Sequence, residues 1–132
     1  PKSEAVFLAL HFLNAQLNST TGDEVFELTE ITNALQKIVN YHFKCNFDEE
    51  TISYQRFITH LKYFLMRQMK GELLKFQEDT LAATIIDKCP KEYECTNKIE
   101  LYLKDKKNWA ISNTEKMYLI LHIRNLMIKT FE

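Results

Sequence analysis

Residues that break helices are almost absent from this chain. Its 132 residues include two glycines and two prolines, where average usage would give about nine and about seven. Few sharp turns can be built from such a composition, so long helices joined by short connections are expected. A chain of this length buries roughly two thirds of its unfolded surface on folding. The sequence therefore predicts a compact all-α domain that needs neither a metal nor a disulfide.

The charges of the side chains nearly cancel, with 17 lysines and arginines against 18 aspartates and glutamates. The basic excess that favours direct nucleic-acid binding is therefore missing.

The three cysteines, Cys45, Cys89 and Cys95, form no CxxC pair, which suits unpaired thiols in a reducing compartment. Because no apolar run reaches about 18 residues, the sequence predicts a cytoplasmic protein without a membrane anchor.

Apolar residues recur at three- and four-residue steps along most of the chain, which is the period of an amphipathic helix. Gly71 stands where the helix at residues 53–70 is expected to end. Pro90 stands where the helix from residue 90 to about 107 is expected to begin. Ser112 and Glu115 match a capping box, in which each side chain binds a free amide of the other residue. Helices are expected at residues 3–18, 25–43, 53–70, in the second part of 73–88, from 90 to about 107, and at 112–129.

The helix within residues 51–70 carries a histidine at the edge of its apolar stripe. His60 shares this edge with Phe57 and Phe64, one turn away on either side. A histidine in this setting is more often a packed boundary residue than a functional one. The helix alone therefore does not decide whether His60 has a function.

A segment near the beginning of the chain recurs near its end. Residues 3–14 and 114–125 share Glu, Leu, Leu, His and Asn at identical spacing. Self-similarity over a domain-sized distance indicates tandem domains, so residues 1–18 are expected to close a preceding domain. Residues 19–24 would be a linker, and residues 25–132 a second domain. Core packing does not require a His and an Asn three residues later in both copies, so a shared site is indicated.

With these segments in view, the chain resembles the tandem PTS regulation domains of BglG/SacY-type transcriptional antiterminators. The residues YQRFITHLKYF (54–64) are similar to the first histidine motif of the second such domain. The residues LILHI (119–123) are similar to its second motif, and EAVFLALH (4–11) to the closing helix of the first domain. The resemblance implies a bundle of about five helices, preceded by one extra helix from a truncated upstream domain.

The resemblance also implies a function and a site. His60 and His122 would be phosphoacceptors, and His11 would correspond to an acceptor of the first domain. The phosphoryl group would come from the sugar phosphotransferase system, through the phosphocarrier HPr and a sugar-specific enzyme II. The protein would form a homodimer, would not be an enzyme, and would need no cofactor. RNA would be bound only through an N-terminal module that this chain lacks.

Helical spacing suggests which residues support a phosphate on these histidines. Arg56 precedes His60 by four residues and Arg67 follows it by seven, so both share roughly its face of the helix. Asn125 lies one turn after His122 and is expected to orient its ring or to hold an anionic oxygen.

Two alternative functions remain open at this stage. The same phosphorylated domain occurs in DNA-binding transcriptional activators, which only the sequence upstream of this chain would distinguish. A metal-binding domain could use the four histidines His11, His42, His60 and His122, but no HExxH motif or carboxylate-rich ligand set accompanies them.

Overall fold

The computed structural model describes residues 22–72, 74 and 79–130. These residues form an all-helical domain without strands, which confirms the predicted fold class. The helix expected at residues 3–18 lies outside the described residues, as does His11, so the division into an upstream helix and a second domain stays a prediction. The helices are α2 (Gly22–Phe43), α3 (Ile52–Lys70), α4 (Asp79–Lys88), α5 (Pro90–Lys107) and α6 (Asn113–Thr130).

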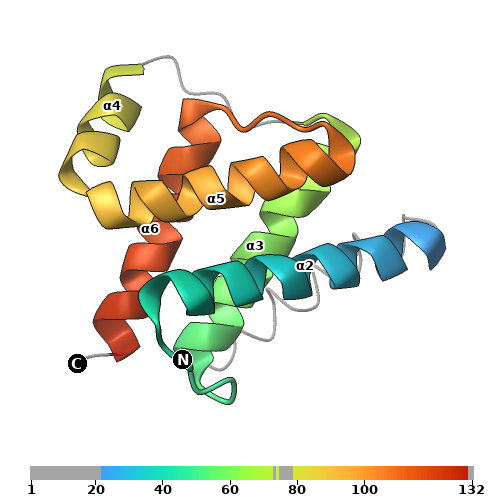
Figure 1. Cartoon of the computed structure of the whole chain (residues 1–132), viewed down its shortest axis with the longest axis horizontal. Helices are drawn as coiled ribbons and strands as arrows, with labels where there is room; N and C mark the ends of the chain where they lie inside the picture. The colour runs from blue at the N-terminus through green and yellow to red at the C-terminus, as the bar shows by residue number, and fades with distance from the viewer. Residues whose placement is uncertain (1–21, 73, 75–78, 131–132) are drawn as a thin grey trace, which may run out of the picture.

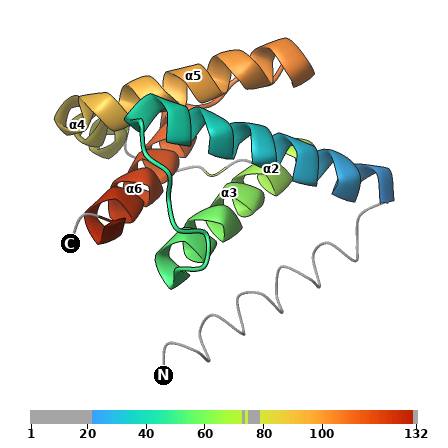
Figure 2. The ribbon, with the colours of Figure 1, turned by 60° about the horizontal axis from the view of Figure 1, so that its bottom comes forward.

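The helices are arranged in two crossed layers (Figure 1). Helices α3 and α6 pack against each other and run in opposite directions, and α2 and α5 run in opposite directions across them. Figure 2 shows α2 and α5 on the same side of the α3–α6 pair. Helix α4 packs against α6 and the neighbouring α5. This arrangement brings the middle of α3 next to the middle of α6, although the two segments lie far apart in the sequence.

The core lies between the two layers and takes side chains from α2, α3, α5 and α6. Among them, Leu35 of α2, Phe64 and Leu65 of α3, Leu103 of α5 and Ile123 of α6 are completely buried. Each such side chain stabilises the fold by roughly 1.5–3 kcal/mol. Helix α6 packs against α3, α4 and α5, which explains why its apolar residues extend around most of its circumference. Leu121 is an exception, because it points to the exposed side of α6.

The ends of the helices follow the signals in the sequence, with one difference. Gly71 adopts the left-handed conformation expected after α3, with φ of 70°, and Pro90 occupies the first turn of α5. The Thr51 hydroxyl accepts a hydrogen bond from the Tyr54 amide at the start of α3. Helix α2 begins at Gly22, so its first turn includes residues that the sequence had suggested for the linker.

The capping box predicted at the start of α6 is only half formed. The Ser112 hydroxyl accepts a hydrogen bond from the Glu115 amide at 3.1 Å, as expected. The expected return contact of the Glu115 carboxylate is wrong, because this carboxylate is completely buried and binds Arg67 of α3. Arg67 donates from Nη2 at 2.8 Å and from Nε at 3.0 Å. A buried carboxylate needs a charged partner, and Arg67 supplies one across the helix interface.

The Arg67–Glu115 pair is expected to be important for stability. Replacing Arg67→Met leaves the completely buried Glu115 carboxylate without its cation, which should destabilise the domain by about 3–5 kcal/mol. The measurement is the free energy of unfolding in urea. The control is Lys107→Met, which breaks the half-exposed Lys107–Glu27 pair and should cost at most about 1 kcal/mol. Equal losses in the two variants would contradict the special role of the buried pair.

Candidate functional site: a stacked pair of histidines

The two histidines singled out by the sequence motifs meet face to face. His60 of α3 and His122 of α6 stack with their ring centroids 3.8 Å apart and their planes inclined by 18°. Both rings are partly buried. The antiparallel packing of α3 against α6 causes this meeting, because each histidine lies near the middle of its helix. The two motifs therefore contribute to one site.

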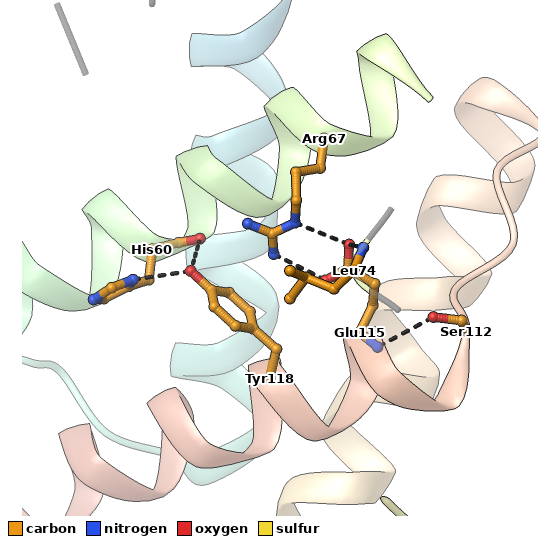
Figure 3. Close-up of polar contacts among 6 residues, drawn as sticks. All are labelled: His60, Arg67, Leu74, Ser112, Glu115 and Tyr118. Carbon is orange, nitrogen blue, oxygen red and sulfur yellow. Dashed lines mark hydrogen bonds and ion pairs between the residues drawn. The ribbon is translucent and has the colours of Figure 1, made fainter. Parts of the chain in front are cut away.

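Tyr118 belongs to the same cluster, and the sequence reasoning missed it. Its hydroxyl lies 2.9 Å from Nδ1 of His60 and donates to the main-chain oxygen of His60 at 3.3 Å, as Figure 3 shows. The Tyr118 ring also meets the His122 ring edge-on, with the centroids 4.5 Å apart. Tyr118 precedes His122 by four residues, a spacing that puts two side chains on one helix face. That spacing was the available signal, but Tyr118 was not singled out from it.

Arg67 connects this cluster to the buried ion pair. Its guanidinium carbon lies 4.4 Å from the centroid of the Tyr118 ring, while its nitrogen atoms bind Glu115 (Figure 3). Arg67 therefore holds Tyr118 against the histidines in the structure. Its expected contact with a phosphate stays a prediction, since a phosphate would have to compete with Glu115 for the guanidinium.

The two other expected supporting residues are both exposed. Arg56 is an exposed cation one turn before His60, and its predicted role as a phosphate contact is untested. Asn125 is exposed and, within the part of the chain that the structure describes, forms no hydrogen bond to His122. The expected role of Asn125 beside His122 therefore stays a prediction. The His122 ring turns toward α3, where Tyr118 and His60 lie.

The surroundings of the two histidines favour their neutral forms. Burial lowers the pKa of His60, and the positive charges of Arg56 and Arg67 act in the same direction. Burial, the neighbouring His60 ring and the same two arginines lower the pKa of His122 to about 4. A neutral imidazole has a free lone pair on one nitrogen, so at neutral pH each ring is able to act as a nucleophile.

The described residues offer little to a metal ion. No three His, Cys, Asp or Glu side chains in this part of the chain converge on a point where they could hold one. His42, which the metal-binding alternative would need, hydrogen-bonds through Nε2 to the main-chain oxygen of Lys91 at 2.9 Å. His42 is thus a packed residue of the α2–α5 contact.

Comparison with known proteins identifies the family. The PRD domain model matches residues 32–126. The chain is similar to the transcription antiterminator LicT of Bacillus subtilis, with 38% identity over 127 residues. It is 32% identical over 126 residues to the beta-glucoside operon antiterminator of Dickeya chrysanthemi. In both cases the alignment covers 96% of this chain, but only 46% and 44% of the relative.

The chain therefore belongs to the PRD domain family, which confirms the resemblance to the PTS regulation domains of transcriptional antiterminators. It spans less than half the length of these relatives. No helix among the described residues is long and apolar enough to cross a membrane.

The low pKa of His122 predicts how stability depends on pH. The unfolded chain binds a proton at this histidine near pH 6.5, whereas the folded domain does so only near pH 4. Stability should therefore be complete above pH 6.5 and fall as the pH drops toward 4. Between neutral pH and about pH 5 we expect this histidine to account for a loss of about 2 kcal/mol.

The measurement is urea unfolding across this pH range for the wild type and for His122→Gln. The variant lacks the titrating imidazole, so its free energy of unfolding should fall less steeply with decreasing pH. The same slope in both proteins would contradict the neutral state of His122.

Proposed function

We propose that this domain is the phosphorylated regulatory part of a transcriptional antiterminator, controlled by the sugar phosphotransferase system. The observation that carries the proposal is the stack of His60 and His122, which joins the two histidine motifs in one partly buried site. Membership in the PRD domain family and the names of the relatives as antiterminators support it. These names also favour antitermination over the alternative of a DNA-binding activator.

In the proposed reaction, a neutral imidazole of the pair attacks the phosphorus atom of a phosphorylated partner. The phosphocarrier HPr is the proposed donor, and a sugar-specific enzyme II is proposed to act on the whole protein as well. Arg56, exposed and one turn from His60, is placed to contact the incoming phosphate. The domain itself catalyses no turnover, because it is the substrate of its partners. The reaction would take place in the cytoplasm, where these partners are found.

The phosphate would act on the packing of α3 against α6. A phosphoryl group carries about −1.5 to −2 charges at neutral pH, here bonded to one ring of the stacked pair and next to the other. Arg67 is a partly buried cation beside this site, and its guanidinium is shared between Glu115 and the ring of Tyr118. Attraction of Arg67 toward the phosphate would weaken its bond to Glu115 and shift the α3–α6 interface. We propose that this shift is transmitted to a homodimer and to an RNA-binding module elsewhere in the whole protein.

The experiment incubates the 132-residue chain with HPr and its phosphodonor system and measures acid-labile protein phosphate. The wild type is expected to be labelled. His60→Ala and His122→Ala should each lose label, and a triple variant that also carries His11→Ala should lose all of it. His42→Ala serves as the control, because His42 is packed against Lys91 outside the pair, and it should keep full labelling. A wild type without acid-labile phosphate would disprove the proposal.

A further inference from the structure

We propose that Tyr118 is a positioning residue that keeps the ring proton of His60 on Nδ1 and leaves Nε2 as the atom that accepts the phosphoryl group. This inference rests on the proposed function of His60 as a phosphoacceptor. It goes further by naming the acceptor atom and the residue that selects it.

The Tyr118 hydroxyl has a single proton, which it can donate to only one partner. The oxygen of this hydroxyl lies 2.9 Å from Nδ1 of His60 and 3.3 Å from the main-chain oxygen of His60, and it also accepts a hydrogen bond from the Arg67 guanidinium, which can only donate. A main-chain oxygen can only accept a hydrogen bond, so the single hydroxyl proton is directed to it. The contact with Nδ1 is then a hydrogen bond only if Nδ1 carries a proton and donates. Only this tautomer of His60 satisfies both contacts.

Packing of the Tyr118 ring fixes the position of its hydroxyl. The Tyr118 ring is held by the Arg67 guanidinium, 4.4 Å from its centroid, and by the edge-on contact with His122. Arg67 is itself held by two hydrogen bonds to the buried Glu115. Burial raises the pKa of Tyr118, so its hydroxyl keeps its proton at neutral pH. While the Arg67–Glu115 ion pair is intact, the Tyr118 hydroxyl therefore keeps both its proton and its position beside His60.

The other ring nitrogen of His60, Nε2, is accessible to a phosphoryl donor. Nε2 of His60 lies on the side of the ring away from Tyr118 (Figure 3). Among the described residues this nitrogen has no hydrogen-bond partner. It is also absent from the fully buried side-chain atoms that lack a partner, so it is at least partly open to solvent. The stacked His122 ring covers a face of the His60 ring, whereas the lone pair of an imidazole nitrogen lies in the plane of the ring. An in-line approach to Nε2 therefore avoids His122.

The transfer step balances without the loss of a proton from His60. The donor is a phosphohistidine whose other ring nitrogen is protonated. Its N–P bond breaks, and the electron pair stays on the donor nitrogen, which leaves a neutral donor imidazole. The Nε2 lone pair of His60 forms the new N–P bond. The His60 ring then carries a positive charge, and its Nδ1 proton becomes a stronger hydrogen-bond donor to the Tyr118 oxygen.

The test uses the full chain labelled with ¹⁵N in its histidines. Long-range ¹H–¹⁵N NMR at about pH 8, where the free imidazoles are neutral, reads the tautomer of His60. Phosphorylation by HPr followed by ³¹P–¹⁵N coupling then identifies the modified nitrogen. The expected result is a proton on Nδ1 before the reaction and a phosphate on Nε2 after it. A proton on Nε2, or a phosphate on Nδ1, would overturn the inference.

The matched variants are Tyr118→Phe and, as control, Tyr102→Phe on α5, which removes a partly buried hydroxyl outside the pair. Tyr118→Phe should give a mixture of His60 tautomers and lower the initial rate of His60 phosphorylation roughly three- to tenfold, as expected for one lost neutral hydrogen bond. Tyr102→Phe should change neither the tautomer of His60 nor the initial rate of its phosphorylation. An unchanged tautomer in Tyr118→Phe would show that Tyr118 does not position the ring.

The two proposals fail in different ways. A wild type that takes up no phosphate but has its His60 proton on Nδ1 would refute the proposed function, while the role of Tyr118 in selecting the tautomer would stand. A wild type that is phosphorylated on Nδ1 of His60 would support the function and refute the inference. The wild-type spectra decide both points even if Tyr118→Phe does not fold.

Discussion

The buried ion pair between Arg67 and Glu115 is the interaction on which the site depends. Glu115 is completely excluded from solvent, and two short hydrogen bonds from Arg67 compensate its charge. A buried carboxylate without a partner is strongly unfavourable, so the pair ties the first turn of α6 to the last turns of α3. The relative position of these two helices determines whether the histidines meet.

The effect of the ion pair reaches the histidines through Tyr118. The guanidinium that binds Glu115 also lies over the Tyr118 ring, and the hydroxyl of this ring contacts His60. The ion pair, the stacking of Arg67 on Tyr118 and the hydrogen bond of Tyr118 thus form one continuous network of contacts from Glu115 to His60. A change at either end is expected to be felt at the other, because each member has few alternative partners in the interior.

The stacked histidines combine two properties that a regulated phosphoacceptor needs. Their neutral state at neutral pH makes them nucleophiles, and their position between α3 and α6 places a new charge at a packing interface. A phosphate there adds negative charge close to Arg56 and Arg67, the two cations that act on both histidines. Regulation by phosphorylation requires a chemical change that alters the balance between two arrangements, and this interface is suited to provide one.

The sequence by itself determined the helices, the two histidine motifs and the family, because these depend on local spacing. The scarcity of glycine and proline predicted the all-α fold, and Gly71 and Pro90 marked helix ends that the structure confirmed. Only the tertiary structure decided the partners of Glu115 and Tyr118, because those partners lie 48 and 58 residues away. Local spacing predicted that the Glu115 carboxylate would cap its own helix. In the fold this carboxylate is buried against α3, where it binds the Arg67 guanidinium instead.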